Sequence, residues 1–197
     1  MLTTSPEATE LPQPFSNLTL KHVTIGSGVQ NYTCKSNQSA PTSIGALATL
    51  YDATTLAYTS LSTLNRIPAR AVRQSLTSSL VFGNPLSIPC IGSFPIIGSH
   101  YFGADGTPTF DLVTVKEILF SKKIADIPAP SRATRDAKGD GAVDWLALSD
   151  NGMGMSVGLG EVYRVETAGG DPPATCDGVE LDTVFSVQYS AEYWFYG

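Results

Sequence analysis

Short stretches of alternating apolar and polar residues recur along the chain, and they restrict the fold more than any other feature. The clearest are residues 162–167 and 184–189, and an aromatic-rich run follows at 191–196. Alternation with a period of two places every second side chain on the same face of a strand. Turns bearing Gly and Pro separate these stretches, and the crossover helices that a parallel sheet requires are missing from the pattern. The sequence therefore predicts an all-β, mainly antiparallel, single-domain sandwich or barrel.

Other segments indicate further strands, one helix and a loose arm. Residues 18–25 and 29–34 also alternate, and we interpret Gly26 to Gly28 as a hairpin turn between them. After Pro68, apolar side chains recur at helical spacing, which predicts one short helix over 69–80. Residues 1–14 contain three prolines and few apolar side chains. We expect them to form a flexible arm, with a single β domain over 15–197.

The charge of the chain excludes two classes of partner. Lys and Arg number 12 against 18 Asp and Glu, for a net charge of −6. A chain of this charge repels polyanions, so we expect no nucleic-acid partner. No apolar run approaches the roughly 20 residues of a membrane-spanning helix, so we expect no membrane span. The oligomeric state cannot be read from these features.

Glycosylation sequons and cysteines indicate a secreted protein. Sequons begin at Asn17, Asn31 and Asn37. We expect that a signal peptide has been removed, because the first residues have neither a basic nor an apolar region. In an oxidising compartment two of the three cysteines would pair. We favour Cys34 with Cys176, while the other pairings stay open, and the apolar neighbours of Cys90 indicate a buried thiol.

Several patterns that carry chemistry in other proteins lack the surroundings they need. Residues 154–158 match the Gly-x-Ser-x-Gly elbow of hydrolases, but a strand pattern follows where the elbow needs a helix. Residues 26–31 begin like a dinucleotide-binding loop, with Asn31 in place of its third glycine. The aspartates between 136 and 144 break the EF-hand spacing. The two histidines are distant and no cysteine pair lies near them, so we expect neither a metal nor a cofactor.

Aromatic side chains near a histidine form the remaining candidate site. His100 and Tyr163 are candidate catalytic residues, because either can donate a hydrogen bond to a substrate carbonyl inside an apolar pocket. The candidate substrate-binding side chains are Tyr101, Phe102, Trp145, Tyr193 and Trp194. The alternative for His100 is a structural histidine that backbone carbonyls satisfy. The alternative for the aromatic side chains is ordinary packing.

Blocks of sequence in a fixed order resemble a known family. They are 30–34 (QNYTC), 48–52 (ATLYD), 98–102 (GSHYF), 141–146 (GAVDWL), 162–165 (VYRV), 167–170 (TAGG), 173–176 (PATC) and 192–196 (EYWFY). Together they resemble secreted fungal proteins defined by a domain of unknown function, DUF3455. The resemblance implies secretion, agrees with the pairing of Cys34 with Cys176 and supplies no activity. Members are often labelled malate dehydrogenase, a label that the failed dinucleotide pattern does not support.

Two function hypotheses of different classes follow. In the first, an aromatic-lined pocket binds a small hydrophobic metabolite, and the function extends to cofactor-free cyclisation of that metabolite. In this hypothesis the chain resembles the fungal hetero-Diels–Alderases of secondary metabolism, although no diagnostic motif carries the resemblance. In the second, the protein is a non-catalytic cell-wall or surface protein that binds glycans. An enclosed cavity of roughly 300 Å³ or more with His100 facing inward would favour the first. A filled core with Trp194 and Tyr196 on an exposed strip would favour the second.

Overall fold

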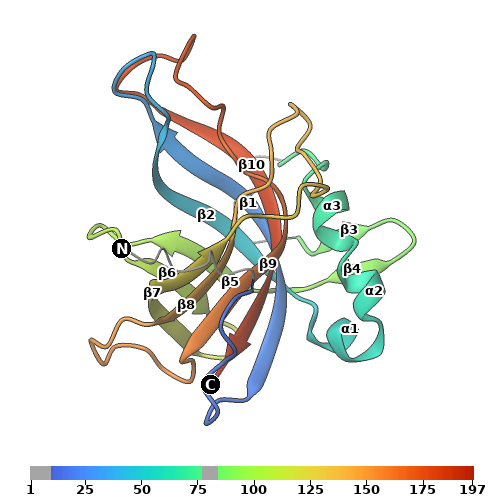
Figure 1. Cartoon of the computed structure of the whole chain (residues 1–197). Helices are drawn as coiled ribbons and strands as arrows, with labels where there is room; N and C mark the ends of the chain where they lie inside the picture. Colours follow the sequence, from blue (N-terminus) through green and yellow to red (C-terminus); the bar gives the residue numbers. More distant parts are fainter. Residues whose placement is uncertain (1–9, 77–83) are drawn as a thin grey trace, which may run out of the picture.

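The chain folds into a closed barrel of eight antiparallel strands. The computed structural model describes residues 10–76 and 84–197. The strand order around the barrel is β1-β10-β9-β8-β7-β6-β5-β2, so that β1 lies between β2 and β10 and closes the circle (Figure 1). The prediction of an all-β, mainly antiparallel fold is confirmed, and the architecture is the barrel rather than the sandwich.

The described elements between β2 and β5 lie outside the barrel. The barrel strands are β1 Leu20–Thr33, β2 Thr42–Asp52, β5 Ile96–Phe102, β6 Pro108–Leu112, β7 Glu117–Ile127, β8 Trp145–Asp150, β9 Glu161–Gly169 and β10 Val184–Tyr196. The outside elements are α1 Thr54–Thr59, α2 Leu61–Leu64, α3 Ile67–Ala71, β3 Leu86–Ile88 and β4 Gly92–Phe94. They lie along one side of the barrel (Figure 1). No helix in the described ranges has the length and apolar character needed to cross a membrane.

The helical segment begins earlier than the sequence pattern predicts. Thr54 opens α1, where the Asp52 side chain accepts hydrogen bonds from its N–H and its hydroxyl group. Pro68 lies in the first turn of α3, where its missing N–H leaves no helical hydrogen bond unmade. The helix predicted over 69–80 overlaps α3, which ends at Ala71, and its positions 77–80 lie outside the described residues.

Two hydrophobic cores share the barrel wall. The lumen core contains large aromatic side chains from β6 and β10, among them Phe110, Tyr189, Tyr193 and Phe195. The outer core lies between β1, the helices and the β3–β4 hairpin. Its members include Val23, Ile25, Leu64, Ile67 and Phe94. Because side chains alternate along a strand, β10 contributes Tyr193 to the lumen core and the neighbouring Trp194 to the edge of the outer core.

Gly26 and Gly28 lie in the middle of β1, so the predicted hairpin turn is wrong. β1 pairs through this stretch with β10 on one side and with β2 on the other. A Cβ atom on Gly26 would come within 2.9 Å of Cδ2 of Tyr193, and one on Gly28 within 2.6 Å of Cα of Ala48. Glycine is used here for close approach rather than for turning, and it lets the Tyr193 ring occupy the lumen.

A disulfide joins two loops at one end of the barrel. Cys34 and Cys176 are bonded across a sequence separation of 142, which confirms the favoured pairing. Cys90 is free and exposed, so the prediction of a buried thiol is wrong. Its neighbour Ile88 takes the buried position in the β3–β4 hairpin, and the turn that begins there carries Cys90 outward.

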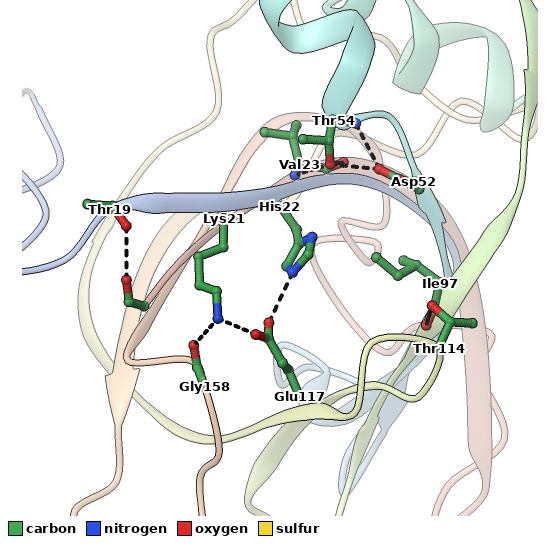
Figure 2. A network of polar contacts seen from close by, with 11 residues as sticks. Thr19, Lys21, His22, Val23, Asp52, Thr54, Ile97, Thr114, Glu117 and Gly158 are labelled. Atoms are coloured by element: carbon green, nitrogen blue, oxygen red, sulfur yellow. Dashed lines mark hydrogen bonds and ion pairs between the residues drawn. The ribbon is translucent and has the colours of Figure 1, made fainter.

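A polar network spans the opposite end (Figure 2). Lys21 and His22, at the start of β1, both contact the carboxylate of Glu117 at the start of β7. His22 Nε2 lies 3.0 Å from Glu117 Oε2, and Lys21 Nζ also donates to the Gly158 carbonyl at 3.0 Å. Since β1 and β7 are four strands apart in either direction around the barrel, these contacts cross the lumen and close this end.

Candidate functional site: two aromatic sites on opposite faces of one wall

The structure divides the predicted site residues between the inside and the outside of the barrel. His100, Phe102 and Tyr193 face the lumen, where their rings are neighbours. The remaining predicted side chains face outward. Trp145, Tyr163 and Trp194 share one external groove, whereas Tyr101 lies between two lumen-facing residues of β5 and therefore points away from the lumen. The candidate catalytic residues His100 and Tyr163 are thus on opposite sides of the wall.

The external groove, called the outer groove below, has a volume of about 380 Å³. Its aromatic lining is Trp145, Tyr163, Trp194 and Tyr196, with Ile127 and Val165 beside them. Residues 10–14 form another part of its boundary. Trp145 and Trp194 are the only two tryptophans in the sequence. Strands β7 to β10 therefore present a largely aromatic surface, and residues 10–14, which lie outside any helix or strand, run beside it.

Glu161 links this segment to the groove. Its side chain is almost fully buried, and Oε2 accepts the backbone N–H of Phe15 at 3.2 Å. The Tyr163 hydroxyl group lies 3.4 Å from the same oxygen. Burial first, and the negative charge of Glu161 second, raise the pKa of Tyr163. Tyr163 therefore presents a neutral hydroxyl group to the groove at physiological pH.

Glu192 fixes the orientation of Trp194. Its side chain is 1% exposed, and Oε2 accepts the indole N–H of Trp194 at 2.9 Å. With its amide oriented so that both ends are satisfied, Asn65 donates to Oε1 at 3.2 Å. Burial raises the pKa of Glu192 to about 7, against the lowering effect of the Trp194 hydrogen bond. The indole N–H of Trp145 is enclosed and has no hydrogen-bond partner in the described part of the chain.

The second site, called the lumen pocket below, is a cavity of about 40 Å³. Its apolar walls are Phe102, Pro108, Phe110, Leu146 and Leu148. Its polar lining is Gln30, His100, Arg164 and Tyr193. Tyr193 shares a hydrogen bond of 2.9 Å with the Tyr189 hydroxyl group. The lumen is thus nearly filled, and its remaining space adjoins polar side chains.

His100 is held by a backbone carbonyl, as the structural alternative describes. Its Nδ1 atom lies 2.9 Å from the Thr109 carbonyl oxygen, and its ring stacks on Phe110 at 4.1 Å. Burial lowers the pKa of His100 to about 4, so the ring is neutral at pH 7. With Nδ1–H donating to Thr109, Nε2 is an acceptor. His100 in this tautomer has no N–H left to donate to a ligand.

Sequence reasoning missed Gln30, Arg164 and Glu192. The sequence does indicate that Arg164 faces inward, because it lies two residues from Val162 in an otherwise apolar strand and therefore on the same, buried face. A charged residue at such a position faces the core side of the strand. For Gln30 and Glu192 the pattern carried no comparable signal, because polar residues recur on both faces of the surrounding stretches.

The remaining sequence motifs lie at the surface or in loops. Asn17 and Asn37 are exposed, whereas Asn31 lies within β1 and its side-chain oxygen accepts the Ser186 hydroxyl group at 2.7 Å. Ser156, the serine of the elbow-like motif, accepts the backbone N–H of Phe120 at 3.0 Å. Strand β9 follows it, so the strand-to-helix turn of a hydrolase elbow is not formed.

The family described as protein of unknown function (DUF3455) matches residues 14–197, which confirms the resemblance seen in the sequence. No curated protein and no solved structure matches the chain. Function must therefore be argued from the geometry of the two sites.

Proposed function

Because this chain belongs to the DUF3455 family, whose description assigns no activity, we propose its function from its own geometry: it binds a small, flat, apolar molecule in the outer groove. The observation that carries the proposal is the gathering of four aromatic side chains around a space of about 380 Å³. Small-molecule sites are usually concave, mostly apolar and roughly 300–1,000 Å³ in volume. The lumen pocket is far below this range.

The polar groups of the groove indicate which flat molecules fit best. The indole N–H of Trp145 is enclosed and has no partner among the described residues, so a ligand oxygen that reaches it after a small shift of the ring would satisfy it. Trp194 has already committed its N–H to Glu192 and offers its ring for stacking. An aromatic ketone combines these properties, since its rings stack and its carbonyl oxygen accepts. We therefore place aromatic ketones at the head of the ligand class.

Intrinsic tryptophan fluorescence tests this proposal directly, because both tryptophans line the groove. Titration with flavone, corrected for its own absorption, should give saturable quenching. Trp194→Leu should weaken flavone binding at least tenfold, whereas Tyr101→Leu, on the outer face of a different strand, should leave it unchanged. Trp145→Phe should weaken flavone more than naphthalene, because only flavone has an acceptor oxygen. Saturable binding of xylan or chitin oligosaccharides without flavone binding would support the glycan hypothesis instead.

Cyclisation of the bound molecule is the catalytic extension of this function. Tyr163 supports it, since its neutral hydroxyl group makes only a long hydrogen bond of 3.4 Å to Glu161 and can donate to a ligand carbonyl in its place. Holding a flexible precursor in one orientation is itself worth several kcal/mol. Product formation from an ortho-quinone methide and an alkene should be accelerated by the protein and reduced in Tyr163→Phe. Equal product with heat-denatured protein would contradict catalysis and leave binding intact.

We propose further that the protein acts outside the cell. The disulfide between Cys34 and Cys176 supports this, because such bonds persist in oxidising compartments. Asn17 and Asn37 are exposed and accessible to glycosylation. Expression in a eukaryotic host with a secretion signal should yield protein whose mass falls after removal of N-glycans. Secreted protein without glycan at either site would remove that part of the proposal.

A further inference from the structure

The lumen pocket contains an arginine whose charge has no carboxylate partner among the described residues. Arg164 is 8% exposed. Its Nε and Nη2 atoms donate to a single backbone oxygen, that of Asp144, at 3.2 and 2.9 Å. The ion pairs within the described ranges involve other cations. A buried charge is normally paired, because its removal from water is costly.

Gln30 adds a second unused donor to the same pocket. Its side chain is 5% exposed, and Nε2 is enclosed without a hydrogen-bond partner in the described part of the chain. Leaving such a group unpaired costs about 1–3 kcal/mol. Gln30 comes from β1 and Arg164 from β9, and both line the cavity of about 40 Å³. Two side chains from different strands, each with an unused donor, therefore line one small space.

The pocket has the size and chemistry of a carboxylate site. A water molecule needs roughly 10–15 Å³ in this measure, so about 40 Å³ accepts a group of about three to four non-hydrogen atoms. The walls around the donors are apolar. Two carboxylates, Asp144 and Asp171, lie near Arg164, because all three charges act on the Tyr32 hydroxyl group. Both aspartates are exposed. Water and salt screen exposed charges much more than a buried one, so they weaken rather than cancel the attraction.

From these observations we propose that the lumen pocket binds a small carboxylate, or the carboxylate end of a larger ligand, between Arg164 and Gln30. The guanidinium group supplies the charge and at least one N–H that Asp144 does not use. The Gln30 amide supplies the second donor. This site is separate from the outer groove, which lies on the other side of the wall, and the two proposals can fail independently.

Acetate is the probe that tests the site. Acetate should raise the melting temperature of the wild-type protein by several degrees at about ten times its Kd, when it replaces chloride at constant ionic strength. Acetamide, which has nearly the same shape without the charge, should bind at least tenfold more weakly. Tryptophan fluorescence should stay constant during the acetate titration, since both tryptophans are outside the lumen.

Variants of the two donors decide the outcome. Gln30→Met should be more stable than wild type without acetate, because it removes an unpaired amide, and it should lose the acetate response. Arg164→Met should also lose the response, while Arg73→Met, at an exposed arginine, should retain it. If Arg164→Met does not fold, Gln30→Met alone is decisive. An equal acetate effect in Gln30→Met, no effect in wild type at 100 mM (about the limit of a useful weak site), or equal binding of acetamide would each overturn the proposal.

Discussion

The lumen and the outer groove use the same residue types on the two faces of the β9–β10 wall, with different results. Toward the lumen, the aromatic rings line a cavity of about 40 Å³, whereas those outside line a groove of about 380 Å³. The lumen is enclosed by strands, and empty space there forfeits contacts on every side. On the outer face, the part of the groove lining that does not come from the barrel strands is residues 10–14. Aromatic content alone therefore does not locate a binding site, because the face on which it lies decides.

On each face, burial shifts the pKa of one side chain in favour of its neutral form. Burial lowers the pKa of His100 in the lumen to about 4 and raises that of Glu192 on the outer side to about 7. The shifts have opposite signs because the charged form is the protonated one for histidine and the ionised one for glutamate. The same physical cause therefore gives the two faces opposite dependences on pH.

The largest difference between the faces should come from added volume. Gly28→Ala places a methyl group against Ala48 backbone atoms of β2, and the barrel wall cannot yield without losing pairing. We expect a loss of about 3 kcal/mol or more in the free energy of unfolding. Leu47→Ala, at an exposed position next to Ala48, should change it by about 0.5 kcal/mol or less. Urea unfolding measures both, and a Gly28→Ala loss below about 1 kcal/mol would show that the lumen is not tightly packed.

The second effect is the pH dependence due to His100. Its pKa is about 4 in the folded protein, against an ordinary value of 6.5. Below pH 6.5 the unfolded chain binds a proton that the folded protein does not, so stability falls as the pH decreases from about 6.5 to 4. The full loss is about 3 kcal/mol. His100→Phe keeps a ring stacked on Phe110 and should remove this loss from the free energy of unfolding measured between pH 7 and pH 4. If the variant loses as much stability as wild type over this range, the His100 ring is accessible to protons in the folded protein.

Glu192 should produce the opposite dependence. Its pKa is about 7 in the folded protein, against an ordinary 4.5, so the folded state retains a proton that the unfolded chain has released between these values. Stability from this group is fully present below pH 4.5 and is lost as the pH rises from 4.5 through 7, by about 3 kcal/mol. Glu192→Gln should equal wild type at pH 4 and exceed it at pH 8. Glu180→Gln, at an exposed site, should show no such divergence; a Glu192→Gln variant less stable at pH 8 would contradict the burial argument.

The smallest effect compares the same substitution on both faces. Tyr193→Phe removes one partner of the 2.9 Å hydrogen bond with Tyr189 and leaves that hydroxyl group buried and unpaired, which should cost about 1–2 kcal/mol. Tyr163→Phe removes a contact of 3.4 Å with Glu161 and should cost about 0.5 kcal/mol or less. Thermal unfolding of the two variants provides the measurement. Equal losses would mean that the two faces are equally enclosed.

Strand parity already separates the two sites within the sequence. Tyr193 and Trp194 are adjacent in β10 and must face opposite sides of the sheet, so a single pocket lined by both was excluded by the alternation itself. The turn predicted at Gly26 to Gly28 failed for a different reason. Local signals at glycine indicate freedom to turn, but pairing with a strand on each side keeps β1 extended through these positions.

The sequence by itself determined the all-β class and the family, because strand alternation and short motifs are properties of neighbouring residues. It favoured the pairing of Cys34 with Cys176, and the structure decided it. Tertiary structure decided the closure of the barrel, the contact of Lys21 and His22 with Glu117, and the meeting of Gln30 with Arg164. Those pairs lie roughly a hundred residues apart, and their distances follow from strand register around the barrel. Register depends on packing of the whole lumen, and no local pattern encodes it.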